Sequence, residues 1–384
     1  MNTETKVYLK KRFKEYYWSH EVAAPSEVHK REFGVGTLED KIKFRHKAFK
    51  SEKELSQFLR TEAPYYISYS AAYYEYPGQP MGEKCWLGAD LIFDLDMPMT
   101  LLDQGRLDDV KAEAEALVEF LVEDFGFSMD DIRVNFSGSK GYHIHVVSED
   151  VRTLSADARR EIIDYIAGTG LDLDYFIKET GGPAGVKWGR FNPKVVSGGR
   201  TGPKSDSKGW AGRIYRVTDD VLRMPPEKLC AFAGVDKRTA KKVEDNRETY
   251  LRAFGEGRWE LPWKELKGGI LKRSIESQAV QVTDEDRQVT GDVSRLIRLP
   301  DTIHGGSGLL AGRVADLESF NPLTDAVAFT GGDVKARMLA DVGVFDLMGR
   351  RFGGYKASEE VALPECAGVY LMLKGLAEYS GGQA

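Results

Sequence analysis

Residues 91–98 (LIFDLDMP) constrain the fold of this chain more than any other segment. An apolar run leads up to Asp94 and the pattern then alternates, which is typical of a buried strand that ends at Pro98. Side chains two residues apart share a face of a strand, so Asp94 and Asp96 would point the same way. Adjacent carboxylates raise each other's pKa unless a cation lies between them, and a hard divalent ion such as Mg²⁺ relieves the repulsion. A solvated turn is the other interpretation of an isolated Asp-x-Asp pair.

Length and composition limit the classes of protein to which the chain can belong. Its 384 residues suffice for two or three domains, and 42% apolar residues can fill a sizeable core. We see no apolar run long enough to span a bilayer, and the polar residues 1–11 contain no signal-peptide core. The three cysteines are far apart in sequence, which favours buried thiols over a disulfide framework or a zinc knuckle. We therefore expect a cytoplasmic protein whose net charge of −6 leaves nucleic-acid binding to local basic patches.

A Gly-rich turn at residues 137–141 (SGSKG) separates two further strand-like segments. The pattern predicts a hairpin, and a turn with exposed backbone N–H groups, a serine and Lys140 suits a phosphate group. His143 and His145 would share one face of the second strand. Three interpretations of the histidine pair remain open: a metal-binding His-x-His, a phosphate-binding His143 beside a structural His145, or two structural residues.

Basic residues are concentrated in local patches. Residues 6–20 are predicted to form a helix with a basic face, and residues 42–49 alternate as in a strand with three cations on one face. Residues 181–216 combine nine glycines and eight lysines or arginines with aromatic residues that include Trp210 and Tyr215. Cations interleaved with aromatic rings are typical of a template channel, so we expect this segment to be a long cationic loop with stacking groups. A solvated surface is the alternative for each patch.

Several further segments are predicted to be helices. The segment at 219–266 is highly charged and interrupted by prolines, as expected for a helical insertion. The segments at 333–350 and 364–378 are expected to be the two C-terminal helices. The predicted helices lie at 106–125, 155–167, 219–266, 333–350 and 364–378.

Residues 284–308 offer a further carboxylate, which we expect on a distant strand, then a cationic strand and a histidine just before a Gly-rich turn. With the aspartate pair and the Ser/Lys/His turn they form a coherent set. Carboxylates hold divalent metals, the metals bridge triphosphate oxygens, and cations with histidines hold the β- and γ-phosphates, which is the chemistry of two-metal nucleotidyl transfer. A phosphoesterase could use the same carboxylates, but it has less need of a separate triphosphate cradle.

Three motifs follow one another along the chain: WLGADLIFDLD at 86–96, FSGSKGYHIHV at 136–146 and VTGDVSRLIRLPDTIHGGSG at 289–308. In this order they resemble the catalytic small subunit of archaeal and eukaryotic DNA primases. Each motif alone is modest, but the combination is specific, and the resemblance covers residues 10–315.

The resemblance implies a fold and an activity. The fold would be α/β (α+β), a primase catalytic core with an RNA-recognition-like mixed sheet and a helical insertion. The core would occupy residues 1–180 and 276–384, the latter with C-terminal helices, and a basic Gly-rich loop with the helical insertion would occupy residues 181–275. The activity would be template-directed primer synthesis from NTPs or dNTPs on single-stranded DNA, as a nucleotidyltransferase.

The resemblance also implies the site residues. Asp94 and Asp96 match the family's metal-binding pair, and the third aspartate, 18 residues ahead of His304, is Asp286 rather than Asp284 or Asp292. These three would be catalytic and would bind Mg²⁺ or Mn²⁺. The implied nucleotide-binding residues are Ser137, Lys140, His143, Arg298 and His304, with Glu32 and Arg45 as further site positions.

Two features depart from the family pattern. Ser139-Lys140 stands where many members carry one or two arginines, so phosphate contacts would be weaker or redistributed. Residues 97–106 contain no Cys or His where archaeal members usually carry a zinc-binding cluster, so we predict no structural zinc.

The family's small subunit works with a large subunit, which predicts a heterodimer and no membrane partner. Two alternatives to a primase remain: a free-standing repair-type polymerase of the same superfamily, and a non-catalytic nucleic-acid-binding subunit that binds a template without turnover.

Overall fold

The computed structural model describes residues 1–180 and 199–382, and of residues 284–286 it describes the backbone alone. The chain divides into two compact units. The first comprises Met1–Val118, Phe127–Ile163 and Val282–Ala384, and the second comprises Glu119–Gly126 and Asp164–Gln281. The first unit combines helices with antiparallel strand pairs, so the fold is of the predicted α/β (α+β) class. None of the described helices is both long and apolar enough to cross a membrane.

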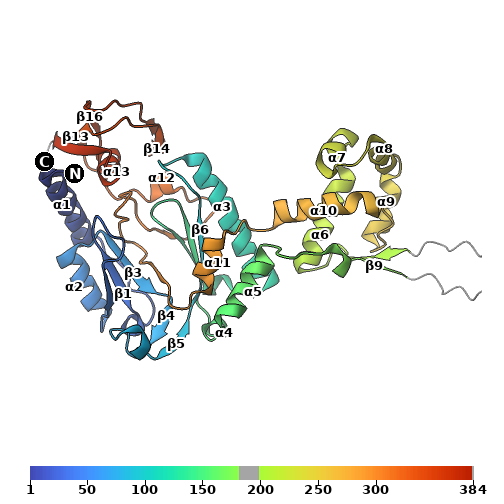
Figure 1. Cartoon of the computed structure of the whole chain (residues 1–384), viewed down its shortest axis with the longest axis horizontal. Coiled ribbons are helices and arrows are strands. Elements are labelled where there is room, and N and C mark those ends of the chain that lie inside the picture. Colours follow the sequence, from blue (N-terminus) through green and yellow to red (C-terminus); the bar gives the residue numbers. More distant parts are fainter. Residues whose placement is uncertain (181–198, 383–384) are drawn as a thin grey trace, which may run out of the picture. The chain divides into compact units, whose positions relative to one another are not determined.

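The first unit contains a four-stranded antiparallel sheet in the order β11-β3-β1-β2. Its strands are β1 (Phe33–Gly36), β2 (Phe44–Lys47), β3 (Tyr66–Ser70) and β11 (Leu296–Arg298). Helices α1 (Thr3–Ser19) and α2 (Glu52–Glu62) pack against each other beside this sheet (Figure 1). Their apolar faces supply buried residues to the core, as expected for amphipathic helices.

A second four-stranded antiparallel sheet has the order β12-β7-β8-β6. Its strands are β6 (Leu91–Asp96), β7 (Ile132–Phe136), β8 (Gly141–Val146) and β12 (Arg313–Val314). The predicted strand before Pro98 and the predicted hairpin around the Gly-rich turn are therefore confirmed. Burial along β6 is continuous as far as Phe93 and then becomes partial at the two aspartates, because the strand leaves the core there.

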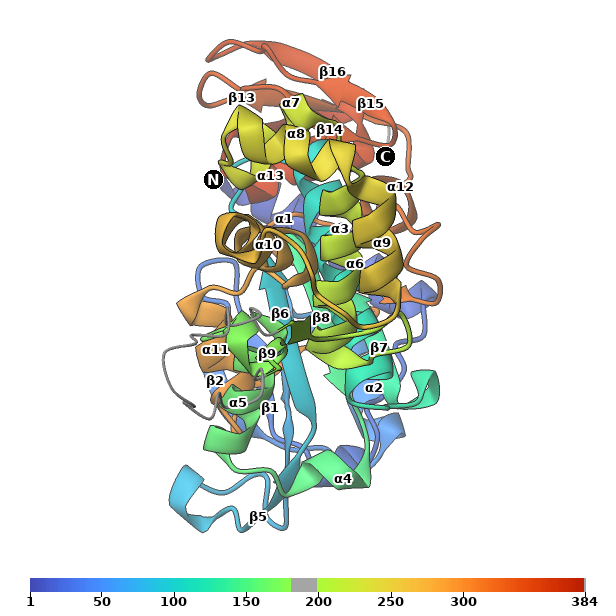
Figure 2. The same cartoon turned by 90° about the vertical axis from the view of Figure 1, so that its right-hand side faces the viewer.

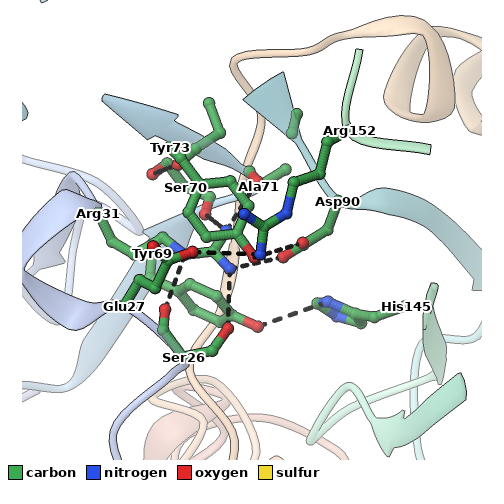
Figure 3. Close-up of polar contacts among 12 residues, drawn as sticks. Ser26, Glu27, Arg31, Tyr69, Ser70, Ala71, Tyr73, Asp90, His145 and Arg152 are labelled. Carbon is green, nitrogen blue, oxygen red and sulfur yellow. Dashed lines mark hydrogen bonds and ion pairs between the residues drawn. The ribbon is translucent and has the colours of Figure 1, made fainter. Parts of the chain in front are cut away.

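An ion pair between Arg31 and Asp90, with side chains 1% and 2% exposed, lies at the centre of a buried polar cluster (Figure 3). All donor nitrogens of Arg31 have partners. Nη2 lies 2.7 Å from Asp90 and 3.2 Å from the Ser26 hydroxyl, and Nε lies 3.2 Å from the Ser26 carbonyl. Nη1 donates to the carbonyls of Ser70 and Ala71 at 3.0 and 2.7 Å. The cluster thus connects the segments that precede β1 and β6 with the end of β3.

The Asp90 carboxylate is satisfied from its other side as well. The Tyr73 hydroxyl donates to Asp90 at 2.7 Å, and the Tyr73 ring lies 3.6 Å from the Arg31 guanidinium. The neighbouring Tyr69 hydroxyl lies 3.4 Å from Nδ1 of His145, whose Nε2 is buried without a hydrogen-bond partner among the described residues. Burial lowers the pKa of His145 to about 3, so this histidine is neutral in the folded protein.

The predicted helices at 106–125 and 155–167 are present as α3 (Gln104–Glu119) and α5 (Ala156–Ile166). The helix continues past α3 as a π-helical segment, Phe120–Asp124. The apolar stripe that predicted α3 is buried, at Leu107, Val110, Ala114 and Leu117.

The C-terminal part differs from the prediction of two closing helices. Residues 333–350 contain β13 (Asp333–Met338) and β14 (Phe345–Leu347) instead of a helix. Burial alternates residue by residue along β13, so the period is two and the helical interpretation of this segment was wrong. The second predicted helix is present only in part, because α13 (Glu365–Leu373) is followed by β17 (Ala377–Gly382). β17 and β16 (Glu360–Pro364) flank β13, and Figure 2 shows β13 beside β16.

The two ends of the described chain meet. The backbone N–H of Tyr379 in β17 donates to the Thr5 hydroxyl of α1 at 2.9 Å, and the rings of Tyr8 and Tyr379 stack with centroids 4.3 Å apart. The Asn2 amide donates to Glu378 at 3.2 Å. The first helix and the last strand are therefore fixed to each other.

The second unit is mostly helical. Its helices are α6 (Gly209–Arg223), α7 (Pro226–Ala233), α8 (Lys237–Asp245), α9 (Arg247–Gly255) and α10 (Trp263–Gln278). They agree with the predicted helical character of residues 219–266, but the first of them begins earlier in the sequence.

The prediction of a cationic loop at residues 181–216 falls partly outside the described residues, at 181–198. For Trp210 and Tyr215, which the structure describes, the prediction of a surface loop was wrong. Trp210 lies in α6, is 4% exposed and packs near Phe120, and Tyr215 stacks on Phe254 with centroids 4.3 Å apart. Both rings therefore belong to helix packing within this unit rather than to a surface loop.

Candidate active site

The register between β6 and β8 places Asp94 opposite His143 and Asp96 opposite Gly141. Both aspartates therefore project from the same face of the sheet. Only glycine fits at position 141, because a Cβ there would lie 1.8 Å from the Leu95 carbonyl oxygen and 2.5 Å from Oδ1 of Asp96. The absence of this side chain leaves room for the Asp96 carboxylate beside the turn.

A basic side chain lies beside each carboxylate. Nε2 of His143 lies 3.3 Å from Oδ1 of Asp94, and Nζ of Lys140 lies 3.2 Å from Oδ2 of Asp96. Oδ1 of Asp94 is nevertheless inaccessible to solvent and accepts no well-directed hydrogen bond from any described residue. Buried carboxylate oxygens are costly to leave unmatched, so this atom is available to a ligand.

The two carboxylates differ in their electrostatics. Burial would raise the pKa of Asp94, but His143, Arg295 and Lys140 together lower it. Burial and the charge of Asp94 raise the pKa of Asp96, with Lys140 acting in the opposite direction. Two carboxylates side by side thus disfavour their joint ionisation, which a bound cation would reverse.

The turn after β7 is closed largely by Ser137. Its hydroxyl accepts hydrogen bonds from the N–H groups of Lys140 and Gly141 at 3.3 and 3.1 Å, so these two donors are not open as the sequence suggested. Gly138 has φ +81°, and a Cβ at this position would lie 2.7 Å from Cβ of His304. The turn therefore needs glycine both for its backbone conformation and for the close approach of the segment that carries His304.

Arg298 approaches from the first sheet, on β11 opposite Ser68 of β3. Its guanidinium lies 5.0 Å from the Tyr66 ring centroid. Nη1 is inaccessible to solvent and has no hydrogen-bond partner in the described part of the chain. Burial lowers the pKa of Arg298, yet an arginine remains charged, so this site holds an uncompensated donor.

His304 is 6% exposed, and its tautomer follows from its partner. The N–H of Gly306 donates to Nδ1 at 3.1 Å, so Nδ1 is an acceptor and the ring proton lies on Nε2. Burial, with the charge of Arg298, lowers the pKa of His304 well below its usual range. His304 is therefore a neutral hydrogen-bond donor.

These groups line one cavity of about 360 Å³ within the first unit. Among the predicted residues it brings together Asp94, Asp96, Ser137, Lys140, His143, Arg298, His304 and Arg45. It is also lined by Lys41, Asp292 and Arg295, which the sequence reasoning did not assign to the site. Asp292 and Arg295 lie within the third motif, which could have pointed to them, whereas Lys41 carries no such indication. Cations thus face the carboxylate pair across the cavity.

Glu32 does not line this cavity. Its side chain is fully buried, and it accepts hydrogen bonds from Nε of Arg45 at 3.0 Å and from the N–H of His46 at 3.1 Å. Nζ of Lys84 lies 3.5 Å from its other oxygen. Glu32 therefore contacts Arg45, which lines the cavity, while its own carboxylate lies outside the cavity.

The backbone of Asp286 lies in helix α11 (Asp284–Gly291), which packs against β6. The expectation that the third carboxylate comes from a strand was therefore wrong, although its element is next to the strand with Asp94 and Asp96. Among the side chains that the structure describes, no three His, Cys, Asp or Glu residues converge closely enough to hold a metal ion.

The residues present nonetheless fit a hard divalent cation. Two carboxylates on one face supply the oxygen ligands that Mg²⁺ and Mn²⁺ prefer, and an Asp94 oxygen is buried without a well-directed hydrogen bond. The facing cations and the neutral donor suit the phosphates of a substrate. Fold and site together define an α/β protein whose cavity is suited to a phosphate-bearing substrate.

Comparison with known proteins specifies the class. The family model for the DNA primase small subunit matches residues 93–316. The DNA primase small subunit PriS of Methanococcoides burtonii is 38% identical, with 99% of this chain and 100% of that protein covered. Those of Methanothrix thermoacetophila and Haloarcula marismortui are 36% and 33% identical, each with 98% of this chain covered. The chain belongs to the DNA primase small subunit family, and these relatives are archaeal.

Proposed function

We propose that this chain is the catalytic subunit of a DNA primase. It transfers a nucleotidyl group from an NTP or dNTP to a 3′-hydroxyl opposite a single-stranded DNA template, and so makes short primers for replication. The observation that carries the proposal is the pairing of β6 with β8, which holds Asp94 and Asp96 against a cavity whose facing wall carries Arg298 and His304. Membership of the primase small subunit family supports the same conclusion.

Asp94, Asp96 and Asp286 would hold Mg²⁺ or Mn²⁺, which when bound supplies charge neutralisation at the triphosphate and favours ionisation of the 3′-hydroxyl. Arg298 donates from its unpartnered Nη1 to a phosphate oxygen, and His304 donates from Nε2. Because both donors are held by packing before substrate binds, little reorganisation is needed when charge develops on the phosphates.

The remaining positions support this arrangement. Lys140 partly balances the charge of the aspartate pair, His143 lies against Asp94, and Lys140 with Arg45 adds positive charge along the path of the triphosphate. Ser137 shapes the turn that carries Lys140. We also propose that the chain acts in a heterodimer with a primase large subunit and that it needs no structural zinc.

A template-dependent extension assay tests the proposal. It compares the wild type with Asp94→Asn and with Asp333→Asn, a matched control on the exposed side of β13. The template is poly-pyrimidine single-stranded DNA, with and without a primer, and the substrates are NTPs or dNTPs with Mg²⁺ or Mn²⁺. We expect product from the wild type and the control, and a loss of at least about a thousandfold in Asp94→Asn.

Full activity in Asp94→Asn would show that this site is not catalytic. If the wild type makes no product alone, the assay is repeated with the primase large subunit, alongside a template-binding titration. A complex that binds template and never extends a primer would favour the non-catalytic binding subunit.

A further inference from the structure

A second and larger depression lies within the first unit, next to the active-site cavity. It has a volume of about 1150 Å³ and runs between α1 and the hairpin formed by β1 and β2. We call it the α1 groove. Six of its lining residues are cations, Lys6, Lys10, Lys11, Lys14, Arg45 and Lys47, and two are acids, Glu39 and Glu62. The chain as a whole carries a net charge of −6, so this local excess of positive charge runs against the overall balance.

The lysines on α1 follow the helix axis. Lys6, Lys10 and Lys14 recur every fourth residue and Lys11 lies three residues before Lys14, so these four exposed lysines form one stripe that lines the groove. Like charges at this spacing weaken a helix by about 0.2–0.5 kcal/mol per pair, so helix stability does not account for the stripe. A polyanion lying along the helix would be attracted by all of these charges at once, although Nζ of Lys6 also lies 3.5 Å from Glu39 and Nζ of Lys10 donates to the Ala63 carbonyl at 3.1 Å.

Exposed and half-buried rings accompany the cations. Phe44 on β2 is 57% exposed, so packing in the core does not explain a large apolar side chain at this position. Nζ of Lys47 lies 4.6 Å from the Phe58 ring centroid, and Nζ of Lys10 lies 5.5 Å from that of Tyr65. Alternating cations and rings are the combination by which proteins bind single-stranded nucleic acid without regard to sequence.

The groove is continuous with the active site through Arg45, which lines both cavities. Lys41 and Ile42 in the connection between β1 and β2 line the active-site cavity, whereas Phe44 and Lys47 line the groove. The hairpin therefore separates the active-site cavity from the α1 groove and contributes lining residues to both. A strand that lies in the groove would reach the nucleotide across Arg45.

We propose that the α1 groove binds the single-stranded template next to the active site, with backbone phosphates along the lysine stripe and a base stacked on Phe44. The inference rests on the proposed function, since it names the path of the template for that reaction. It also gives the template a binding surface in the described residues, independent of residues 181–198.

The test measures binding rather than catalysis. The dissociation constant of the full chain for fluorescein-labelled oligo-dT is determined by anisotropy between about 50 and 200 mM salt. The variant Lys6→Gln/Lys11→Gln/Lys14→Gln removes three exposed charges and spares Lys10, which donates to the Ala63 carbonyl at 3.1 Å. The control Lys53→Gln/Lys335→Gln/Lys356→Gln makes the same charge change at exposed positions that do not line the groove.

We expect the stripe variant to bind at least tenfold more weakly at the lower salt concentration. Its slope of log affinity against log salt should be smaller by about 2, the value for three lost phosphate contacts on a single strand. The control should keep the wild-type slope. An unchanged slope in the stripe variant overturns the proposal.

A second pair of variants tests the stacking. Phe44→Ala should weaken binding about tenfold with the salt slope unchanged, because it removes a ring and no charge. The matched control is Trp86→Ala, which removes a ring that is 42% exposed, lies outside α1 and does not line the groove.

The outcomes separate this inference from the proposed function. If primer extension depends on Asp94 while the stripe variant binds oligo-dT like the wild type, the groove assignment is wrong and the enzymatic proposal stands. If the stripe variant loses only its association with the primase large subunit, the groove is a protein interface and the template assignment is likewise wrong. If binding depends on the stripe and no extension occurs even with the large subunit, the groove is retained and the catalytic proposal fails.

Discussion

Two arginines of the first unit, one buried and one half-buried, lie in contrasting surroundings. Arg31 is 1% exposed, and each of its donor nitrogens has a partner, chiefly Asp90 and the carbonyls at the end of β3. Arg298 is half-buried beside the same strand, but its Nη1 is inaccessible to solvent and has no hydrogen-bond partner within the described residues. A fully satisfied polar network rigidifies a fold, whereas a buried donor without a partner costs stability unless a ligand completes it.

The aspartates show the same contrast. Asp90 is satisfied by Arg31 and Tyr73, whereas Asp96 has a raised pKa because burial and the charge of Asp94 disfavour its ionised form. One cluster therefore supports the structure and the other is set up for a ligand. Substitutions that remove a charge should have opposite effects on stability in the two places.

The largest effect should come from Asp96→Asn, on activity. We expect primer extension to fall at least about a thousandfold, because a metal ligand is lost. The melting temperature should stay level or rise, because the ionised carboxylate of a group with a raised pKa destabilises the folded state at neutral pH. Thermal unfolding and the extension assay on one preparation measure both. Retained activity would contradict the role of Asp96 as a metal ligand. A clear fall in melting temperature would show that Asp96 supports the structure as Asp90 does.

Arg31→Met should act on stability instead. It leaves Asp90 buried without its cation, so we expect the free energy of unfolding to fall by about 3 kcal/mol. Chemical denaturation measures this change. The control is Arg313→Met, because the ion pair of Arg313 with Asp301 is half exposed and should contribute less than about 1 kcal/mol. Equal effects of the two substitutions would mean that the buried cluster has no special structural role.

Arg298→Met, like Asp96→Asn, should impair the reaction and leave stability largely unchanged. Its effect on the reaction should be smaller than that of Asp96→Asn. We expect KM for the nucleotide to rise about tenfold, since one charge-assisted hydrogen bond to a phosphate is lost, with little or no loss of stability. Steady-state kinetics with varied nucleotide and thermal unfolding test this prediction. Arg337→Met, on the exposed face of β13, is the control. A stability loss as large as that of Arg31→Met would remove the distinction between the two arginines.

The smallest effect concerns His145, whose folded pKa of about 3 lies below the usual value of 6.5. Below pH 6.5 the histidine of the unfolded chain binds a proton, whereas His145 in the folded chain stays neutral until about pH 3. The folded state therefore loses stability as the pH falls below 6.5. Between pH 6.5 and 5.5 the loss should be about 1 kcal/mol, because the unfolded histidine is only half protonated at the upper pH. His145→Gln should flatten the pH dependence of unfolding, and the exposed His29→Gln should not. Parallel curves for His145→Gln and the wild type would contradict this account.

Local sequence patterns correctly predicted the strand that carries the two aspartates of the site and the neighbouring hairpin. The period of two around Asp94 and Asp96 and the glycine-rich turn are short-range features, and the structure pairs them as a strand and hairpin. The prediction was wrong at residues 333–350, where it placed a helix although Val334, Ala336 and Met338 alternate as in a strand. There the burial of every second residue depends on the flanking strands β16 and β17, which follow in the sequence.

Long-range pairing was beyond the sequence argument. Nothing local indicates that Glu32 is buried against Arg45 and Lys84, or that Arg31 pairs with Asp90. The resemblance implied Glu32 and Arg45 as site positions, but only the tertiary structure shows that Glu32 lies against Arg45 and away from the cavity. The helix that carries Asp286 was likewise missed, because its packing against β6 is a tertiary contact.

The meeting of the chain ends has a consequence for biosynthesis. Helix α1 forms one wall of the basic groove, yet the residue of β17 that binds it follows 374 positions later in the sequence. During translation, α1 therefore leaves the ribosome long before Thr5 and Tyr8 can contact Tyr379. This wall of the groove is anchored only after β17 has been synthesised, and a chain cut before β17 would lack the anchor of its helix α1.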